Sequence, residues 1–109
     1  MLKEIKQKEY NSIVHNPETK ECIAVYVWAP WATPCRMLMA ALVELDETND
    51  HVIVYSFDIE AKEGNSDFAA EKGVSSVPTV IFYKGGNELN RVVGMRPLEE
   101  FEDIVVKLF

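Results

Sequence analysis

Hydrophobic and polar positions change their spacing along this chain in a way that predicts strands and helices in turn. Residues 22–28 and 52–57 are apolar almost throughout and rich in β-branched and aromatic side chains, which is typical of strands buried on both faces. Between them, residues 34–49 repeat apolar side chains at helical spacing. The strand, helix, strand order predicts a βαβ unit whose two strands are parallel.

Two shorter helices are predicted on either side of this unit. Residues 5–15 carry a single apolar face and stop at the Asn-Pro pair that follows, since the residue before proline leaves the helical region. A second short helix follows Asn65-Ser66, which can cap it, and it runs through Lys72. Gly73 comes where a left-handed C-cap belongs. Residues 2–5 leave room for only a short N-terminal strand.

The last third of the chain predicts a hairpin followed by a helix. Residues 79–83 and 88–93 have strand patterns and flank residues 84–87, whose Gly-Gly pair is a strong hairpin signal. Residues 97–108 place apolar side chains on one helical face. The whole pattern predicts the α/β class, with a mixed central sheet made of a parallel βαβ unit and an antiparallel hairpin, flanked by helices on both faces.

Composition narrows the classes of protein to which the chain can belong. Its 109 residues suit one compact domain, spanning 1–109. A net charge of -7 argues against nucleic acid or an anionic membrane as partner. The sequence has no apolar run of transmembrane length and no apolar signal core at its N-terminus, which indicates a cytoplasmic protein. With only two cysteines, a disulfide framework is not expected.

The stretch Trp28-Ala29-Pro30-Trp31-Ala32-Thr33-Pro34-Cys35-Arg36 joins the first buried strand to the long helix. Pro34 fits the first helical turn, where its missing N–H removes no hydrogen bond. Cys35 follows it near the helix N-terminus, where unpaired N–H groups and the helix dipole favour an anion such as a thiolate. This stretch is therefore the predicted chemical centre of the chain.

The segment Trp31-Ala32-Thr33-Pro34-Cys35 resembles the Trp-Cys-Gly-Pro-Cys signature of the thioredoxin family, which has variants with Thr before the Pro. The resemblance implies a thioredoxin fold, reduction of protein disulfides in cell redox homeostasis, and no bound cofactor. In that mechanism the first thiolate attacks a substrate disulfide and the second resolves the mixed disulfide. Cys35 has the resolving position and Ala32 stands where the nucleophile belongs. One thiol cannot complete the cycle, so we predict no two-cysteine turnover.

Val77-Pro78 resembles the cis-proline site of the same family, and we expect this bond to be cis. The resemblance implies that the backbone before the proline pairs with an extended peptide of a protein that carries a disulfide or thiol. A shallow apolar groove is predicted to bind that partner. Its expected residues are Trp31, Thr33, Pro34, Val77, Pro78 and Gly94.

Two further positions depart from the family pattern. The family commonly has a buried Asp where this chain has Tyr26, and a Lys where it has Ser56. A phenol is a poor proton acceptor at neutral pH. Cys22, at the strand end away from the motif, is interpreted as a core thiol. The histidines and cysteines show no metal-ligand spacing, and monothiol relatives with an iron–sulfur cluster keep the first motif cysteine, so no metal is expected.

Three functional hypotheses follow. The chain is a thioredoxin with an engineered Cys-to-Ala change at Ala32, whose parent accepts electrons from a thioredoxin reductase. Alternatively, it is a natural redox-degenerate relative that binds proteins without turnover, which the residues Tyr26 and Ser56 favour. The third hypothesis is monothiol chemistry at Cys35, through glutathionylation or a mixed disulfide. The family resemblance also predicts a monomer.

Overall fold

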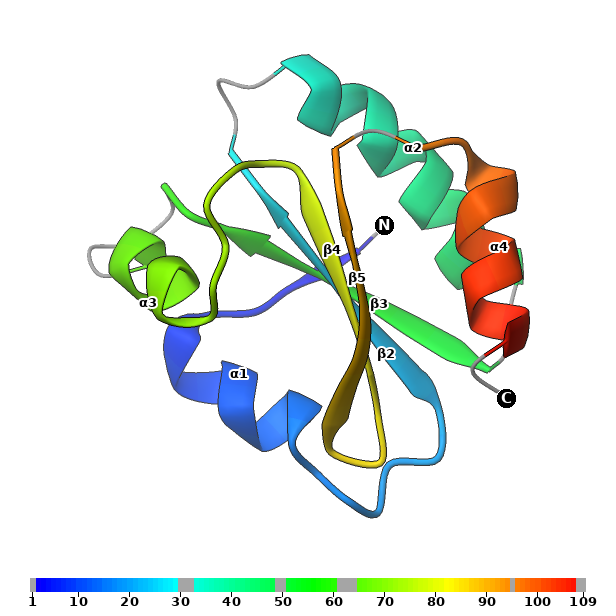
Figure 1. The fold of residues 1–109 in the computed structure, drawn as a ribbon, viewed down its shortest axis with the longest axis horizontal. Helices are drawn as coiled ribbons and strands as arrows, with labels where there is room; N and C mark the ends of the chain where they lie inside the picture. The colour runs from blue at the N-terminus through cyan, green and yellow to red at the C-terminus, as the bar shows by residue number, and fades with distance from the viewer. Residues whose placement is uncertain (1, 30–32, 49–50, 61–64, 95, 108–109) are drawn as a thin grey trace.

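The computed structural model describes residues 2–29, 33–48, 51–60, 65–94 and 96–107, with side chains from residue 38 and from residue 67 in the helices that begin at 33 and 65. The described chain forms a five-stranded sheet with the strand order β1-β3-β2-β4-β5 (Figure 1). The elements are β1 (Lys3–Glu4), α1 (Gln7–Val14), β2 (Cys22–Trp28), α2 (Thr33–Thr48), β3 (Val52–Asp58), α3 (Asn65–Glu71), β4 (Thr79–Lys84), β5 (Asn87–Val93) and α4 (Leu98–Lys107).

The sheet is mixed, as the sequence predicts. β2 runs parallel to β3 and antiparallel to β4, and β4 is antiparallel to β5. The short β1 pairs with β3 in parallel, from Lys3 beside Tyr55 to Glu4 beside Ser56. No helix in the described part of the chain is long and apolar enough to cross a membrane.

The first helix begins later than the sequence pattern predicts. The Ile5 N–H donates to the Ser56 carbonyl oxygen at 2.9 Å, which continues the pairing of β1 with β3. Ile5 is also fully buried, so its backbone and side chain both hold the chain extended there. The helix α1 therefore starts at Gln7 instead of near residue 5.

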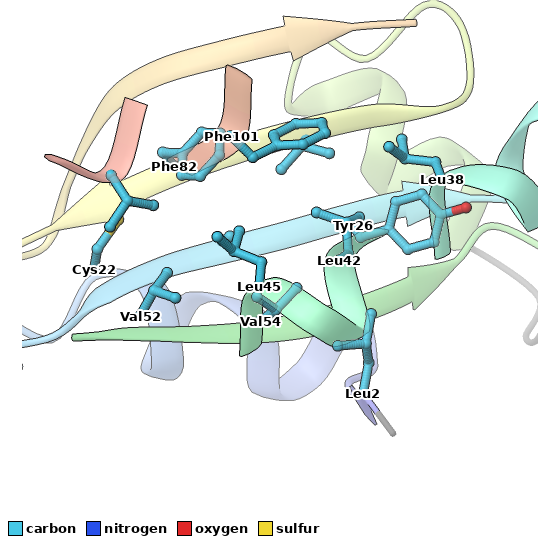
Figure 2. Close-up of a cluster of buried hydrophobic side chains, with 13 residues drawn as sticks. Leu2, Cys22, Tyr26, Leu38, Leu42, Leu45, Val52, Val54, Phe82 and Phe101 are labelled. Atoms are coloured by element: carbon cyan, nitrogen blue, oxygen red, sulfur yellow. The ribbon is translucent and has the colours of Figure 1, made fainter. Parts of the chain in front are cut away.

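Helices cover both faces of the sheet: α1 and α3 lie on one side, and α2 and α4 lie on the other (Figure 1). Alternate residues of β2 point to the two sides. Cys22, Ala24 and Tyr26 join the apolar cluster under α2 and α4, part of which Figure 2 shows. Residues 23, 25 and 27 join the cluster under α1 and α3. This two-sided burial explains why β2 is apolar throughout.

The turns predicted from glycine are present. Gly73 has a φ of +80° and follows α3, where the Val74 N–H donates to the Ala69 carbonyl at 3.0 Å, as in a Schellman cap. Gly85 and Gly86, with φ of +60° and +87°, form the turn between β4 and β5. The predicted cap of α3 differs, because the helix begins at Asn65 itself; short polar residues are tolerated in a first turn.

Candidate functional site

The predicted site lies at the end of the sheet where β2 stops and α2 begins. Val27, next to the last residue of β2, pairs with Thr79, the first residue of β4. Thr79 in turn pairs with Val93, the last residue of β5. The start of α2, the start of β4 and the end of β5 therefore meet at the same end of the sheet (Figure 1).

The motif itself is only partly described. Trp31 and Ala32, predicted as a groove residue and as the position of the missing nucleophile, lie outside the described residues. Thr33, Pro34 and Cys35 form the first turn of α2, which confirms the predicted helical position of the proline and the cysteine. Their side chains also lie outside the described part, so the reactivity of Cys35 stays a prediction.

The structure describes the other predicted groove residues, Val77, Pro78 and Gly94, in full. The Val77–Pro78 bond is cis, in agreement with the expectation. The Gly94 N–H donates to the Pro78 carbonyl oxygen at 2.9 Å, which joins these two predicted residues directly. Val77 is half-buried and contacts the clusters on both faces of the sheet. The structure therefore brings Val77, Pro78 and Gly94 together at one place.

A side-chain hydrogen bond holds the loop before β4. The Thr79 hydroxyl, on a residue that is almost fully buried, donates to the Ser76 carbonyl oxygen at 2.8 Å. This bond closes a tight turn around Val77 and Pro78. Together with the Gly94 hydrogen bond it fixes the backbone that would face a bound peptide.

Sequence reasoning missed two apolar residues at this edge. Val93 is 51% exposed, which is unusual for a valine at the end of a strand, and it lies next to Gly94. Ile59 is half-buried, and its N–H donates to the Trp28 carbonyl at 3.0 Å, beside the end of β2. Side chains alternate along β5, so Val92 packs against the core and Val93 turns away, but two adjacent valines do not reveal in the sequence which of them is exposed.

The two departures from the family pattern are neighbours. Tyr26 and Ser56 are paired in register on β2 and β3, on the side of the sheet that α2 covers. Tyr26 is fully buried, as Figure 2 shows, and stacks on Trp28 with ring centroids 6.2 Å apart and planes within 10°. Trp28 also packs against the core, so it supports the site from beneath. Its Nε1 is buried without an acceptor among the described residues.

A carboxylate that the sequence analysis did not single out also lies at this end of the sheet. Asp58 is the last residue of β3, pairs in register with Trp28, and is 9% exposed. Its Oδ1 accepts the Glu60 N–H at 2.8 Å, so it shapes the turn that leaves β3. An acidic residue at the end of an otherwise apolar strand was the available sequence signal.

Cys22 lies at the opposite end of β2 and is fully buried, as predicted for a core thiol. Burial raises the pKa of its thiol to about 11, and Lys84 only partly opposes this shift. Among the described residues, no group of three or more His, Cys, Asp or Glu side chains is placed to hold a metal ion. The candidate functional residues among those described therefore lie at the end of the sheet where β2 stops and α2 begins.

Known proteins resemble this chain in both sequence and fold. The thioredoxin family model matches residues 1–107. A thioredoxin from Bacillus subtilis is 35% identical over 92 residues, covering 83% of this chain and 86% of the relative. One from Chlamydia pneumoniae is 34% identical over 107 residues, which is 98% of each chain. The solved structure of a Malassezia sympodialis thioredoxin has a TM-score of 0.81 at 23% identity, covering 97% of this chain and 91% of that chain.

Proposed function

Because this chain belongs to the thioredoxin family, we propose that it is a protein thiol–disulfide oxidoreductase scaffold whose two-cysteine turnover is disabled by Ala32. Family membership supports the scaffold, and the sequence supports the lost turnover. In a two-cysteine enzyme, one thiolate attacks the substrate disulfide and a neighbouring thiol then breaks the mixed disulfide. Only Cys35 remains in this motif.

The position of Cys22 is the observation that carries this proposal. The other thiol of the chain begins β2, whereas Cys35 lies in the first turn of α2, beyond the far end of the same strand. A seven-residue strand is about 20 Å long at a rise of ~3.3 Å per residue. A disulfide needs Cα atoms within about 7 Å of each other. Cys22 therefore cannot replace the missing partner of Cys35.

The proposed binding surface for a partner protein, called the Val77 edge below, is formed by Val77, Pro78 and Gly94, together with Trp31, Thr33 and Pro34. An extended peptide with a disulfide or thiol would pair its backbone with the Val77 backbone. The exposed Val93 adds apolar area beside this edge. A thioredoxin reductase is the proposed electron donor of the parent activity.

A second candidate is a natural binding module that does not turn over. The pairing of Tyr26 with Ser56 favours it, because the two positions where relatives commonly carry proton-transfer groups are adjacent and both changed. In that case restoring one cysteine would not restore efficient exchange. The same edge of the sheet would still bind an extended peptide.

Insulin disulfide reduction, with dithiothreitol as the electron source, tests the proposal. The chain as it stands is compared with the Ala32→Cys variant, and with an Ala32→Cys, Cys35→Ser double variant as the matched control. We expect multiple turnover from Ala32→Cys alone, since it alone has both motif thiols. A Cys22→Ala change added to Ala32→Cys should leave the rate unchanged.

The outcomes separate the two candidates. Activity that appears only with Ala32→Cys supports a working scaffold silenced at one position. No activity in either chain supports the binding module, and peptide binding at the Val77 edge then becomes the measurement. Turnover by the unmodified chain at the rate of a two-cysteine relative would refute both.

We propose further that residues 1–109 act as one domain, as a cytoplasmic monomer without nucleic acid as partner. The net charge of -7 supports the absence of nucleic-acid binding. Sedimentation of the purified chain, with and without an added DNA duplex, should show the protein at monomer mass in both samples.

A further inference from the structure

A cavity of about 530 Å³ lies between α2 and the sheet, away from the Val77 edge. Five side chains from four parts of the chain line it: Leu2 before β1, Trp28 on β2, Ser56 on β3, and Met39 and Val43 on α2. Figure 2 shows Leu2 on the same side of the sheet as Tyr26 and the leucines of α2. The volume is within the range of small-molecule sites, about 300–1,000 Å³.

Two features of the sequence leave this space open: the small side chain of Ser56 on β3 and the shortness of β1. Along the α2 side of β3, Val54 is followed by Ser56, whose small side chain fills little of the space beneath the helix. β1 has only two residues, and Leu2, which precedes it, borders the cavity on this side. The space left by a serine and a two-residue strand is bounded on the helix side by Met39 and Val43.

The lining defines the chemistry of a ligand. Of the five described side chains that line it, four are mainly apolar and none is charged. A charged ligand would lose its hydration without gaining an opposite charge, which is strongly unfavourable. The walls therefore select a neutral molecule with an apolar body. The indole of Trp28 and the thioether of Met39 are suited to contact with an aromatic ring.

Ser56 supplies the one hydroxyl among the described residues that line the cavity. The residue is 5% exposed and lines the cavity, so its side chain borders the space that a ligand would occupy. A hydroxyl can both donate and accept, so it can hydrogen-bond to a carbonyl or hydroxyl oxygen of a ligand.

We propose that this cavity is a binding site for a neutral, mainly aromatic small molecule with one oxygen that hydrogen-bonds to Ser56. The site is distinct from the Val77 edge but shares Trp28 with its support and lies under the helix that carries Cys35. The proposal does not depend on disulfide exchange, so it can stand or fall separately from the proposed function.

The test is a titration with naphthol, a neutral two-ring alcohol, followed by two-dimensional amide and methyl NMR on the full chain. Saturable shifts are expected at Leu2, Trp28, Met39, Val43 and Ser56. Signals of the opposite face, such as Tyr10, serve as the internal control and should not move. Shifts confined to Val77 and Gly94, or no saturation, would overturn the proposal.

A cycle of ligand and protein changes isolates the serine. Loss of one neutral hydrogen bond should weaken naphthol binding to Ser56→Ala about fivefold. Naphthalene, which lacks the hydroxyl, should bind the unchanged chain about as weakly as naphthol binds the variant. It should bind both proteins equally. An effect of Ser56→Ala that is equal for both ligands would contradict the assigned hydrogen bond.

Filling the cavity provides the second control. Val43→Trp places a large ring into the space from the half-buried side of α2 and should abolish the shifts. If that variant fails to fold, Met39→Phe fills part of the same space from one turn earlier. A folded variant of either kind that binds naphthol as tightly as the unchanged chain overturns the cavity as the site.

Discussion

At the scale of single residues, burial opposes exchange chemistry at one thiol of this protein, Cys22. Cys22 is fully enclosed among apolar side chains of the sheet and α4, and burial raises the pKa of its thiol to about 11. Cys35 is at a helix N-terminus, the kind of position that favours a thiolate. The surroundings of Cys22 oppose thiolate formation, whereas the reactivity of Cys35 stays a prediction.

We therefore expect Cys22 to resist alkylation in the folded chain. At pH 8 its thiolate fraction is about a hundredfold lower than that of a thiol with the ordinary pKa near 9, and burial blocks the reagent as well. In a Cys35→Ser variant, mass spectrometry after iodoacetamide treatment should find no label under native conditions and complete label in urea. Equal labelling rates in both conditions would refute the assigned burial.

The sequence could identify some residues of the candidate site but not others. Val77, Pro78 and Gly94 were identified by resemblance, and their hydrogen-bonded arrangement confirms that they lie together. Val93 was missed because its pattern of a valine in a strand is the same for a core position and an exposed one. Only the register of an edge strand decides between them, and that register depends on the tertiary fold.

At the scale of elements, the Asp46 side chain provides a hydrogen-bond acceptor beside β3 where no neighbouring strand does. β1 pairs only with Tyr55 and Ser56, so it leaves the preceding part of β3 without a strand neighbour on that side. There the Asp46 carboxylate of α2 accepts the Val54 N–H at 2.9 Å. Val54 is buried, so this hydrogen bond satisfies a donor that water does not reach.

Removing this acceptor should destabilise the fold. We expect Asp46→Ala to lower the free energy of unfolding by about 1–3 kcal/mol, because it leaves a buried N–H unpaired. Asp46→Asn keeps an oxygen acceptor and should recover most of the loss. Glu44→Ala, on the exposed side of the same helix, is the control and should change little. Urea unfolding measures all three, and equal losses for Asp46→Ala and Glu44→Ala would contradict the bond's importance.

The β4–β5 turn offers a matched pair of glycines. An alanine Cβ at Gly85 would meet nothing within 4 Å, whereas at Gly86 it would lie 3.1 Å from the His15 carbonyl oxygen. Both positions have positive φ, which costs an alanine about 1–2 kcal/mol. Gly86→Ala should therefore lower the urea midpoint more than Gly85→Ala. The reverse order would show that the turn does not pack against the end of α1.

At the scale of the whole molecule, buried acidic protons lie on both faces of the sheet. On the α1 side, the Tyr10 and Tyr83 hydroxyls are 2.6 Å apart. Burial raises the pKa of Tyr10 and of Tyr83 above their ordinary value. On the α2 side, burial raises the pKa of Cys22. In the folded state all three groups keep their protons to higher pH than in the unfolded state.

Stability should consequently fall in alkali. Below pH 9 all three groups are protonated in both states and their contribution is complete. Above pH 9 for Cys22, and above pH 10 for the tyrosines, the unfolded chain loses protons first and gains stability relative to the folded one. Each group lowers the free energy of unfolding by about 1.4 kcal/mol per pH unit within its window.

Urea unfolding between pH 8 and pH 11 measures this decline. A Tyr10→Phe variant removes one titrating group, so its decline above pH 10 should be shallower by about 1.4 kcal/mol per pH unit. Constant stability over this range would show that the three protons are not held by the fold.

Most of the architecture could be predicted from the sequence, because its long elements have strong periodicity. The apolar runs of β2 and β3 predict a parallel pair, and the Gly-Gly pair predicts the hairpin between β4 and β5. The late start of α1 could not be predicted, because Ile5 is held extended by one hydrogen bond to β3. The cavity was also invisible, since it depends on what four separate segments leave unfilled.

The strand order has a consequence for synthesis on the ribosome. β2 lies between β3 and β4, yet β4 and β5 follow β2 and β3 in the chain and therefore leave the exit tunnel after them. Until residues 79–84 emerge, one edge of an almost wholly apolar strand has no neighbour, which favours association with other chains. The same late segment completes the Val77 edge, so a nascent chain cannot engage a partner before its last third has joined the sheet.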